Sequence, residues 1–113
     1  MAGAKIVVIY PRPKNLEAFE KVYQREHVPM AVANLGGQTK IVATGILASP
    51  QGTPPFYRIV EVHFPSMQAL EACAVSEGGK ETLAHSVSIS SGGAPIFLVA
   101  EEETFAFSGK ARA

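Results

Sequence analysis

The order of apolar segments in this sequence predicts one α+β domain with an antiparallel sheet and the ferredoxin-like βαββαβ topology. Three observations lead to this prediction. Four short segments rich in β-branched and aromatic residues alternate with two longer segments of helical periodicity. Clusters of Pro and Gly separate the segments. The 113 residues match the size of one domain, and no repeat or low-complexity linker indicates a second, so we expect a single domain over 1–113.

The first predicted strand covers about 5–10, with the sequence KIVVIY. It ends at Pro11 and Pro13, which cannot continue the hydrogen-bond ladder of a sheet. Its residues are apolar at both alternating sets of positions, so both faces of the strand should be covered. Helices can cover one face. The sheet of a second copy is the simplest cover for the other, so we expect a homodimer joined through sheet faces.

The first helical segment is predicted over about 15–35. Asn15 can cap its start, and Gly36 and Gly37 end it. Pro29 lacks an N–H group, so we expect a kink or break near it. The apolar side chains recur at steps of three and four and form one inward stripe, which consists of Leu16, Phe19, Tyr23, His27 and Met30.

The remaining segments complete the topology. We predict strands over about 38–49, 56–64 and 95–103. The Pro-rich loop 50–55 makes the first two of them an antiparallel hairpin. Ser66 can cap a second helical segment over about 66–88, with a break near Gly78. The tail over 104–113 is expected to be a short extension or frayed.

Charge and hydropathy exclude several classes of partner. Lys plus Arg and Asp plus Glu number 10 each, and neither a basic stretch nor a zinc-finger spacing is present, so nucleic acid is not a predicted partner. No apolar stretch approaches the roughly 20 residues that cross a bilayer, so no membrane partner is expected. The apolar stretch 6–10 is too short for a signal peptide. We therefore expect a cytoplasmic protein.

The single cysteine, Cys73, lies in an apolar segment. A lone cysteine cannot form a disulfide within the chain, and its neighbours favour a buried, inert thiol over a catalytic nucleophile. The chain is 47% hydrophobic, which is high for so small a domain, and this again favours burial of some apolar surface against another chain.

The sequence contains no glycine-rich phosphate loop, no GxSxG and no HExxH motif, so candidate site residues come from spacing alone. His27 shares the inward stripe and precedes Pro29. An imidazole titrates near neutrality and can transfer protons, which makes His27 a candidate catalytic residue. We expect it to line an enclosed apolar pocket with Tyr23 and Met30 as ligand-binding residues. Alternatively, His27 is a core imidazole bonded to a backbone carbonyl.

The strand 56–64 carries the other candidates. Tyr57, Glu61 and His63 share one face. Glu61 and His63 are candidate catalytic partners, and Tyr57 is a candidate ligand-binding residue; alternatively, Glu61 and His63 form a buried ionic pair that fixes the dimer register. Strand parity does not reveal which face meets the helices. If it is this one, Glu61 or His63 should lie within about 3–6 Å of His27, directly or through a water.

Two further expectations concern the histidines. His85, in the second helical segment, is expected at the surface or an edge. The three histidines and Glu61 do not follow the spacing of a metal site, so no metal is predicted.

The chain resembles the EthD family, small proteins named for ethyl tert-butyl ether degradation. The similar features run through almost the whole chain, and the His-x-Pro of the first helix is the most specific of them. They are Tyr10-Pro11, Tyr23 with His27-Val28-Pro29-Met30-Ala31, Tyr57-Arg58-Ile59-Val60-Glu61 with Phe64, Ser66-Met67-Gln68-Ala69-Leu70, and Ser76-Glu77-Gly78. The resemblance implies a dimeric α/β barrel, as in antibiotic-biosynthesis monooxygenases, muconolactone isomerases and some polyketide cyclases. It matches His27 to the family's histidine.

The resemblance also implies a function. It favours a small enzyme without a cofactor, of the monooxygenase, isomerase or cyclase type, that acts on a small apolar oxygenated or aromatic compound. In this interpretation His27 takes or supplies a proton at a carbon next to a carbonyl or phenol. A non-catalytic ligand-binding or accessory protein of a degradation pathway is the alternative, and a structural dimer is a third. Family members often carry Trp where this chain has His63, and Asp where it has His85.

Overall fold

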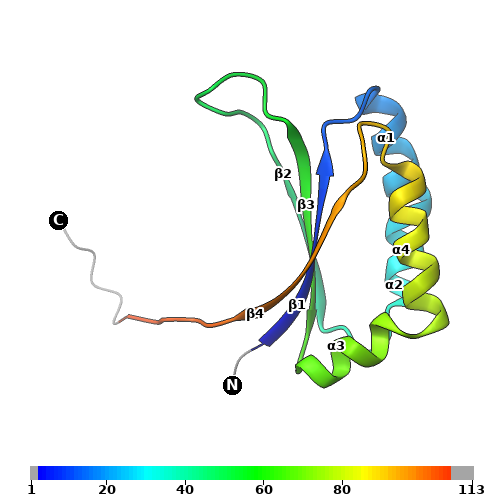
Figure 1. Cartoon of the computed structure of the whole chain (residues 1–113), viewed down its shortest axis with the longest axis vertical. Coiled ribbons are helices and arrows are strands. Elements are labelled where there is room, and N and C mark those ends of the chain that lie inside the picture. Colours follow the sequence, from blue (N-terminus) through cyan, green and yellow to red (C-terminus); the bar gives the residue numbers. More distant parts are fainter. Residues whose placement is uncertain (1–2, 108–113) are drawn as a thin grey trace.

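The computed structural model describes residues 3–107 and has the predicted α+β fold (Figure 1). Its strands occur in the order β2-β3-β1-β4, and all neighbouring strands are antiparallel, which confirms the ferredoxin-like topology. The elements, in chain order, are β1 (Gly3–Pro11), α1 (Leu16–Val22), the π-helical turn η1 (Tyr23–His27), α2 (Val28–Asn34), β2 (Lys40–Gly45), β3 (Phe56–Phe64), α3 (Met67–Ala74), α4 (Glu77–Ile89) and β4 (Ile96–Glu102).

The helices all lie on one face of the sheet (Figure 1). Helices α1, α2 and α4 run along this face, and α3 lies at one end of it. We call this the helix face and the opposite one the open face, because no helix of the described part of the chain covers it. Among residues 3–107, no helix combines the length and the apolar character needed to span a bilayer.

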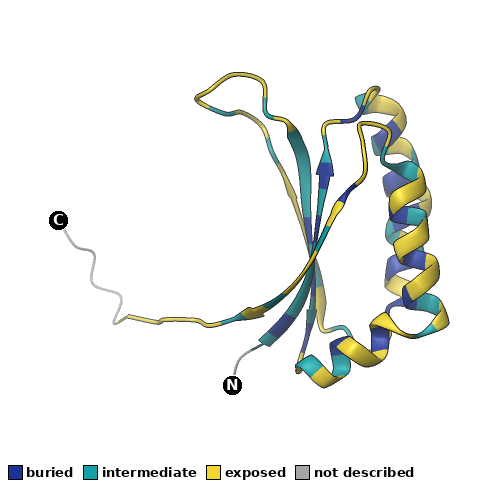
Figure 2. Ribbon diagram, viewed as in Figure 1, coloured by how far each residue is buried: buried dark blue, intermediate teal, exposed yellow. Residues whose placement is uncertain are grey.

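Strand parity assigns each residue to one of the two faces. On β3, Val60, Val62 and Phe64 are buried against the helices (Figure 2). On β1, Ala4, Val8 and Tyr10 are buried in the same layer. Successive side chains of a strand point to opposite faces, so Lys5, Val7 and Ile9 of β1 and Glu61 and His63 of β3 lie on the open face.

The first helical segment buries one residue in every four. The buried residues are Phe19, Tyr23, His27, Ala31 and Leu35. An α-helix has 3.6 residues per turn, so steps of four drift around its surface. The wider π turn compensates for this drift and keeps the stripe facing the sheet.

The π turn also replaces the expected break. The Val28 N–H donates to the carbonyl of Tyr23, five residues earlier, and Pro29 then lies in the first turn of α2, which a proline tolerates. The added residue gives Ala31 the inward position expected for Met30, which is only half-buried. The start of the segment is as predicted, because Asn15 Oδ1 accepts from the Ala18 N–H at 2.9 Å.

The second helical segment divides at Val75–Ser76. Ser66 caps α3 as predicted, and Ser76 caps α4 by accepting from the Gly79 N–H at 3.0 Å. A Cβ at Gly79 would collide with the carbonyl oxygen of Cys73, so this close turn requires a glycine.

Two segments differ from their predicted extent. Strand β2 covers only Lys40–Gly45, so the following loop is longer than expected. The predicted tail over 104–113 is irregular as far as residue 107, and the rest of it lies outside the described residues.

Candidate functional site

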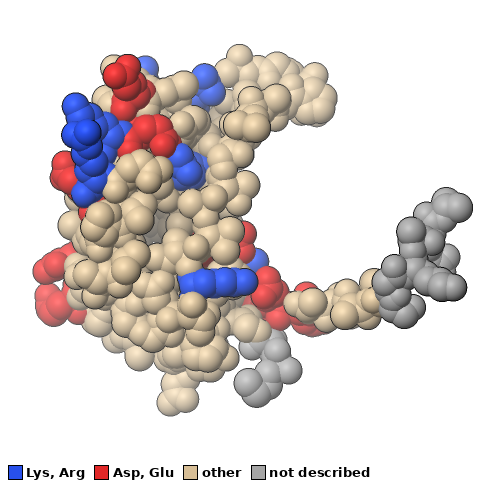
Figure 3. Space-filling model, turned by 180° about the vertical axis from the view of Figure 1, so that it is seen from behind, with Lys and Arg blue, Asp and Glu red and all other residues tan. Residues whose placement is uncertain are grey.

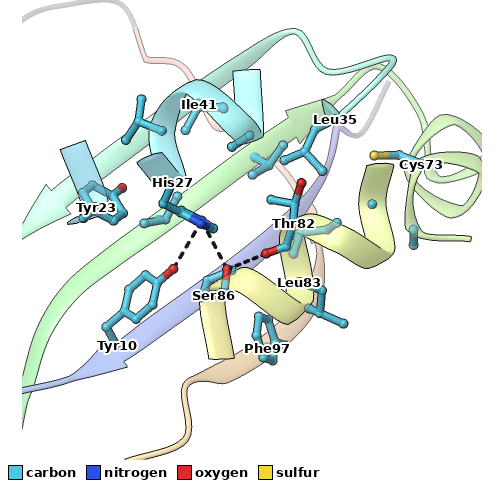
Figure 4. A pocket seen from close by; sticks show the side chains of 18 residues that line it. Tyr10, Tyr23, His27, Leu35, Ile41, Cys73, Thr82, Leu83, Ser86 and Phe97 are labelled. Atoms are coloured by element: carbon cyan, nitrogen blue, oxygen red, sulfur yellow. Dashed lines mark hydrogen bonds between the residues drawn. The ribbon is translucent and has the colours of Figure 1, made fainter. Parts of the chain in front are cut away.

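A cavity of about 110 Å³ lies between the sheet and the helices (Figure 4). Its walls come from the helix face of all four strands, from η1 and α2 on one side, and from α3 and α4 on the other. Most of the lining side chains are apolar. The polar ones gather at one place, where His27, Tyr10 and Ser86 approach one another from three different elements.

His27 lies at the centre of this polar group and is only 6% exposed. Its Nε2 is 3.4 Å from the hydroxyl of Tyr10 and 3.2 Å from Oγ of Ser86. Its Nδ1 is 2.9 Å from Nδ1 of His85. The partners of both ring nitrogens are side chains, so His27 is not the core imidazole bonded to a main-chain carbonyl that the sequence also allowed.

Ser86 and Thr82 complete the group. They lie one turn apart on α4, and both are buried. Ser86 Oγ is 3.2 Å from the carbonyl oxygen of Thr82, so its single proton can go either to that oxygen or to His27 Nε2. The serine can therefore adapt to a donor or an acceptor at His27.

Burial sets the charge of the site. It lowers the pKa of His27 to about 4, with a smaller electrostatic contribution from the neighbouring His85, so the His27 imidazole is neutral at neutral pH. Burial also raises the pKa of Tyr10 to about 12, so its hydroxyl keeps its proton. The site thus combines a neutral base with a neutral hydrogen-bond donor inside an apolar cavity.

Of the three predicted ligand-binding residues, only Tyr23 lines the cavity. Met30 does not line the cavity, because the π turn moves the inward position from Met30 to Ala31. Tyr57 packs its ring 5.7 Å from that of Phe19 and donates its hydroxyl to Glu20 at 3.0 Å, outside the cavity lining. Arg58 forms an ion pair with the same Glu20 carboxylate, and this pair links β3 to α1.

Glu61 and His63 lie on the open face, and the relay to His27 does not form. Both alternate with the buried residues of β3, so the sheet itself separates them from the cavity. Instead, Glu61 Oε1 lies 2.8 Å from Lys5 Nζ and 3.2 Å from His63 Nε2, and Glu102 Oε2 lies 3.4 Å from Lys5 Nζ. The hydrogen bond from Lys5 lowers the pKa of Glu61.

This open-face group has the residue types of a metal site. The ligand atoms of Glu61, His63 and Glu102 lie within 4.8 Å of one another. However, the Lys5 ammonium contacts both carboxylates and supplies the positive charge that a cation would bring. The ammonium therefore offsets one of the two carboxylate charges of the group.

Sequence reasoning missed the three side chains that contact the ring nitrogens of His27. Tyr10 lies on the same face of β1 as Ala4 and Val8, but the sequence did not show that this is the face covered by the helices. Ser86 belongs to a run of small buried residues on α4 with Gly79 and Thr82, a spacing that signals close packing. His85 was expected at the surface or an edge, and its side chain is in fact only 18% exposed and in contact with His27.

Solved structures with the same fold include an EthD family protein from Bacillus halodurans C-125, with a TM-score of 0.82, 23% identity, and coverage of 89% of this chain and 99% of that one. A dimeric ferredoxin-like protein of unknown function from Jannaschia sp. CCS1 has a TM-score of 0.61 and 17% identity over 92% and 100% of the two chains. A hydroxynitrile lyase from Passiflora edulis has a TM-score of 0.67 and 12% identity over 93% and 97%.

These identities are low, so the three structures establish the fold and nothing finer. No curated protein matches the chain. The model of the EthD domain matches residues 12–88, a stretch that includes His27 and Ser86 and covers more than half of the sequence. The fold and this match together show that the chain belongs to the EthD family.

Proposed function

We propose that this protein is an acid–base enzyme that moves a proton at a carbon next to a carbonyl or phenol group of a small, apolar compound. The observation that supports this most directly is the convergence of His27, Tyr10 and Ser86 on one apolar cavity. A buried imidazole with a depressed pKa that faces such a cavity is a frequent feature of functional sites.

The two neutral groups have complementary roles in this proposal. His27 Nε2 takes the proton from carbon. The Tyr10 hydroxyl donates a hydrogen bond to the substrate oxygen, on which negative charge develops as the proton leaves. The same groups return the proton at a second carbon or after ring closure. Of the three reaction types that the family resemblance implied, isomerisation and cyclisation suit this arrangement best, because acid–base catalysis can drive both the proton shift and the ring closure, and neither consumes an oxidant.

The cavity favours an uncharged ligand with few polar atoms. Apart from the polar group around His27, the lining consists mainly of aliphatic and aromatic side chains, and it includes no Lys, Arg, Asp or Glu. The fold is compatible with acid–base chemistry, since the Passiflora edulis neighbour is a hydroxynitrile lyase.

Deuterium exchange tests the proposal without knowledge of the natural substrate. The protein is incubated with cyclohexanone in D₂O, and NMR follows the loss of the protons next to the carbonyl. We expect protein-dependent exchange, and a decrease of about 100-fold or more in His27→Asn. His63→Asn is the matched control, because it removes the open-face histidine, and it should exchange at the wild-type rate.

Two results would contradict the proposal. A folded His27→Asn variant with wild-type exchange would remove His27 from the reaction. Saturable binding of cyclohexanone and of phenol, seen as shifted cavity resonances without exchange in either the protein or its variants, would instead support the alternative of a non-catalytic ligand-binding or accessory protein.

We also propose that two copies pair through their open faces. This face carries apolar side chains from all four strands: Val7 and Ile9, Val42, Ile59, and Ile96 and Leu98. In the side view of Figure 3, charged side chains gather at the two ends of the helical layer and where β4 leaves the sheet, and much of the visible surface between them is uncharged. The Jannaschia neighbour is described as dimeric.

In such a pair the Lys5, Glu61, His63 and Glu102 group would lie at one end of the interface and fix its register. A stable interface of this kind buries about 2,000 Å² or more. Sedimentation at micromolar concentration should show a dimer, and a stable monomer would rule out the pairing.

A further inference from the structure

The two histidines of the site form a hydrogen bond in the plane of their rings. The Nδ1 atoms are 2.9 Å apart, the ring planes differ by only 10°, and the ring centroids are 5.1 Å apart. The centroid separation exceeds the nitrogen separation by about the sum of two ring radii. Both nitrogens must therefore lie close to the line between the centroids, and the rings meet edge to edge rather than face to face.

This geometry couples the protonation of the four ring nitrogens. One Nδ1 must donate and the other must accept, and a neutral imidazole has a single N–H. When His27 Nδ1 donates, His27 Nε2 carries the lone pair that faces Tyr10 and Ser86, and His85 Nε2 carries a proton. When His85 Nδ1 donates, His27 Nε2 carries a proton and His85 Nε2 does not. The two tautomeric states differ by one proton at each outer nitrogen.

Exposure increases along the chain of groups from the cavity outward. His27 is 6% exposed, the His85 side chain 18%, and the Glu26 side chain 65%. Glu26 Oε1 lies 3.9 Å from His85 Nε2, on the side of the ring away from His27. The ionisable groups that face the pair are Tyr10 from β1, and Tyr23 and Glu26 from η1.

We propose that His85 carries protons between His27 and solvent, with Glu26 as the outer proton acceptor; the catalytic part of this proposal depends on the proposed function. As His27 Nε2 takes a proton from the substrate carbon, His27 Nδ1 passes its proton to His85 Nδ1. His85 Nε2 then releases its proton to Glu26 or to water beside it. One proton leaves the substrate, one enters solvent, and both imidazoles end neutral with their tautomers exchanged.

The relay explains how a buried base can work without holding charge. Burial disfavours an imidazolium at His27, and the transfer to His85 leaves His27 neutral after each step. The reverse sequence delivers a proton from solvent to the substrate. Two adjacent residues of α4 serve the two sides of the His27 ring, since His85 contacts Nδ1 and Ser86 contacts Nε2.

Imidazole ¹⁵N NMR tests the relay without any substrate. The ring N–H of His27 is observed in the free protein, and its exchange with solvent is measured in wild type, His85→Asn and Glu26→Gln. Asparagine can bond to His27 Nδ1 but cannot pass a proton on. We expect exchange to slow by about 100-fold in His85→Asn and by a smaller factor in Glu26→Gln. Ser88→Ala, an exposed change on the same helix, is the control and should not slow it.

The outcomes separate the relay from the proposed function. Wild-type exchange in a folded His85→Asn variant would show that the proton leaves through the cavity, and this overturns the relay. Slowed exchange in His85→Asn combined with no deuteration of cyclohexanone by the wild-type protein would retain the relay and contradict the proposed function. His85→Gln gives a second test if the asparagine variant does not fold.

Discussion

The two faces of the sheet are built from equally apolar strands but treat polar groups in opposite ways. On the helix face, His27 and Tyr10 are buried, and both are kept neutral. On the open face, Lys5 and Glu61 are charged and paired. Low polarity around the cavity disfavours charge, whereas a half-exposed face tolerates charges that have partners. Whether helices cover a face therefore decides, more than the residues of that face, whether its polar groups are neutral or charged.

The two histidines nearest the sheet illustrate this difference. His63 follows buried Val62 directly in β3, and this one-residue offset places it on the open face beside Glu61. His27 comes from a helix and reaches the cavity through the π turn. Neighbouring positions in a strand therefore have unrelated environments.

The largest expected effect comes from a carboxylate placed on each face in turn. Val8 is buried on the helix face, and Val7 lies on the open face. Val8→Asp would bury an unpaired charge and cost about 3–5 kcal/mol, enough to leave much of the protein unfolded. Val7→Asp should keep the helical circular dichroism signal and sediment as a monomer. Equal loss of structure in both variants would contradict the assignment of the two faces.

The next effect is the pH dependence that His27 contributes to stability. Its pKa is about 4 in the folded state and near the ordinary value of 6.5 in the unfolded chain. Between pH 6.5 and pH 4, His27 binds a proton in the unfolded state but not in the folded state, so the free energy of unfolding falls as the pH decreases. The loss reaches about 3 kcal/mol by pH 4.

Urea unfolding of wild type and His27→Asn between pH 4 and pH 7 measures this contribution. The asparagine variant lacks the titrating group, so its stability should change less over this range. Parallel curves for the two proteins would mean that His27 is not buried as a neutral base.

A smaller effect in a different pH range belongs to the open face. The pKa of Glu61 is lowered, first by the hydrogen bond from Lys5, so its contribution is present above the ordinary value of 4.5 and is lost as the pH falls through the folded pKa. Lys5→Met should remove this contribution and destabilise the protein at neutral pH by less than about 1 kcal/mol. Unfolding curves of wild type and Lys5→Met between pH 3 and pH 7 measure it, and a destabilisation by Lys5→Met that stays unchanged down to pH 3 would be inconsistent with the pair.

The smallest effect concerns the rate at which a thiol reagent reaches a cysteine on each face, with little change in stability. Cys73 is buried beside the cavity, and burial raises the pKa of its thiol, so a thiol reagent should modify it slowly in the native state. Val42→Cys, made in a Cys73→Ala background, places a thiol on the open face. It should be protected when the protein is dimeric and react quickly when Val7→Asp is added. Rapid reaction of Cys73 in the native protein would show that the helix face opens.

Much of the fold could be predicted from the sequence because short-range physics determines it. Asn15 and Ser66 cap helices where expected, since capping depends on hydrogen bonds three residues away. Pro11 ends β1, and the spacing of Phe19, Tyr23 and His27 identified the inward side of the first helix. The burial of Cys73 was also predicted correctly from its apolar neighbours.

The candidate site depended on long-range packing, which local patterns do not contain. The sequence of β3 does not show which of its two faces the helices cover, so only the position of the helices could assign Glu61 and His63 to the open face. The order of the elements and the inward direction of His27 follow from the periodicity of neighbouring residues, so both could be predicted from the amino-acid pattern. The meeting of Tyr10, His85 and Ser86 at His27 could not, because these groups come from separate elements that are brought together only when the helices pack on the sheet.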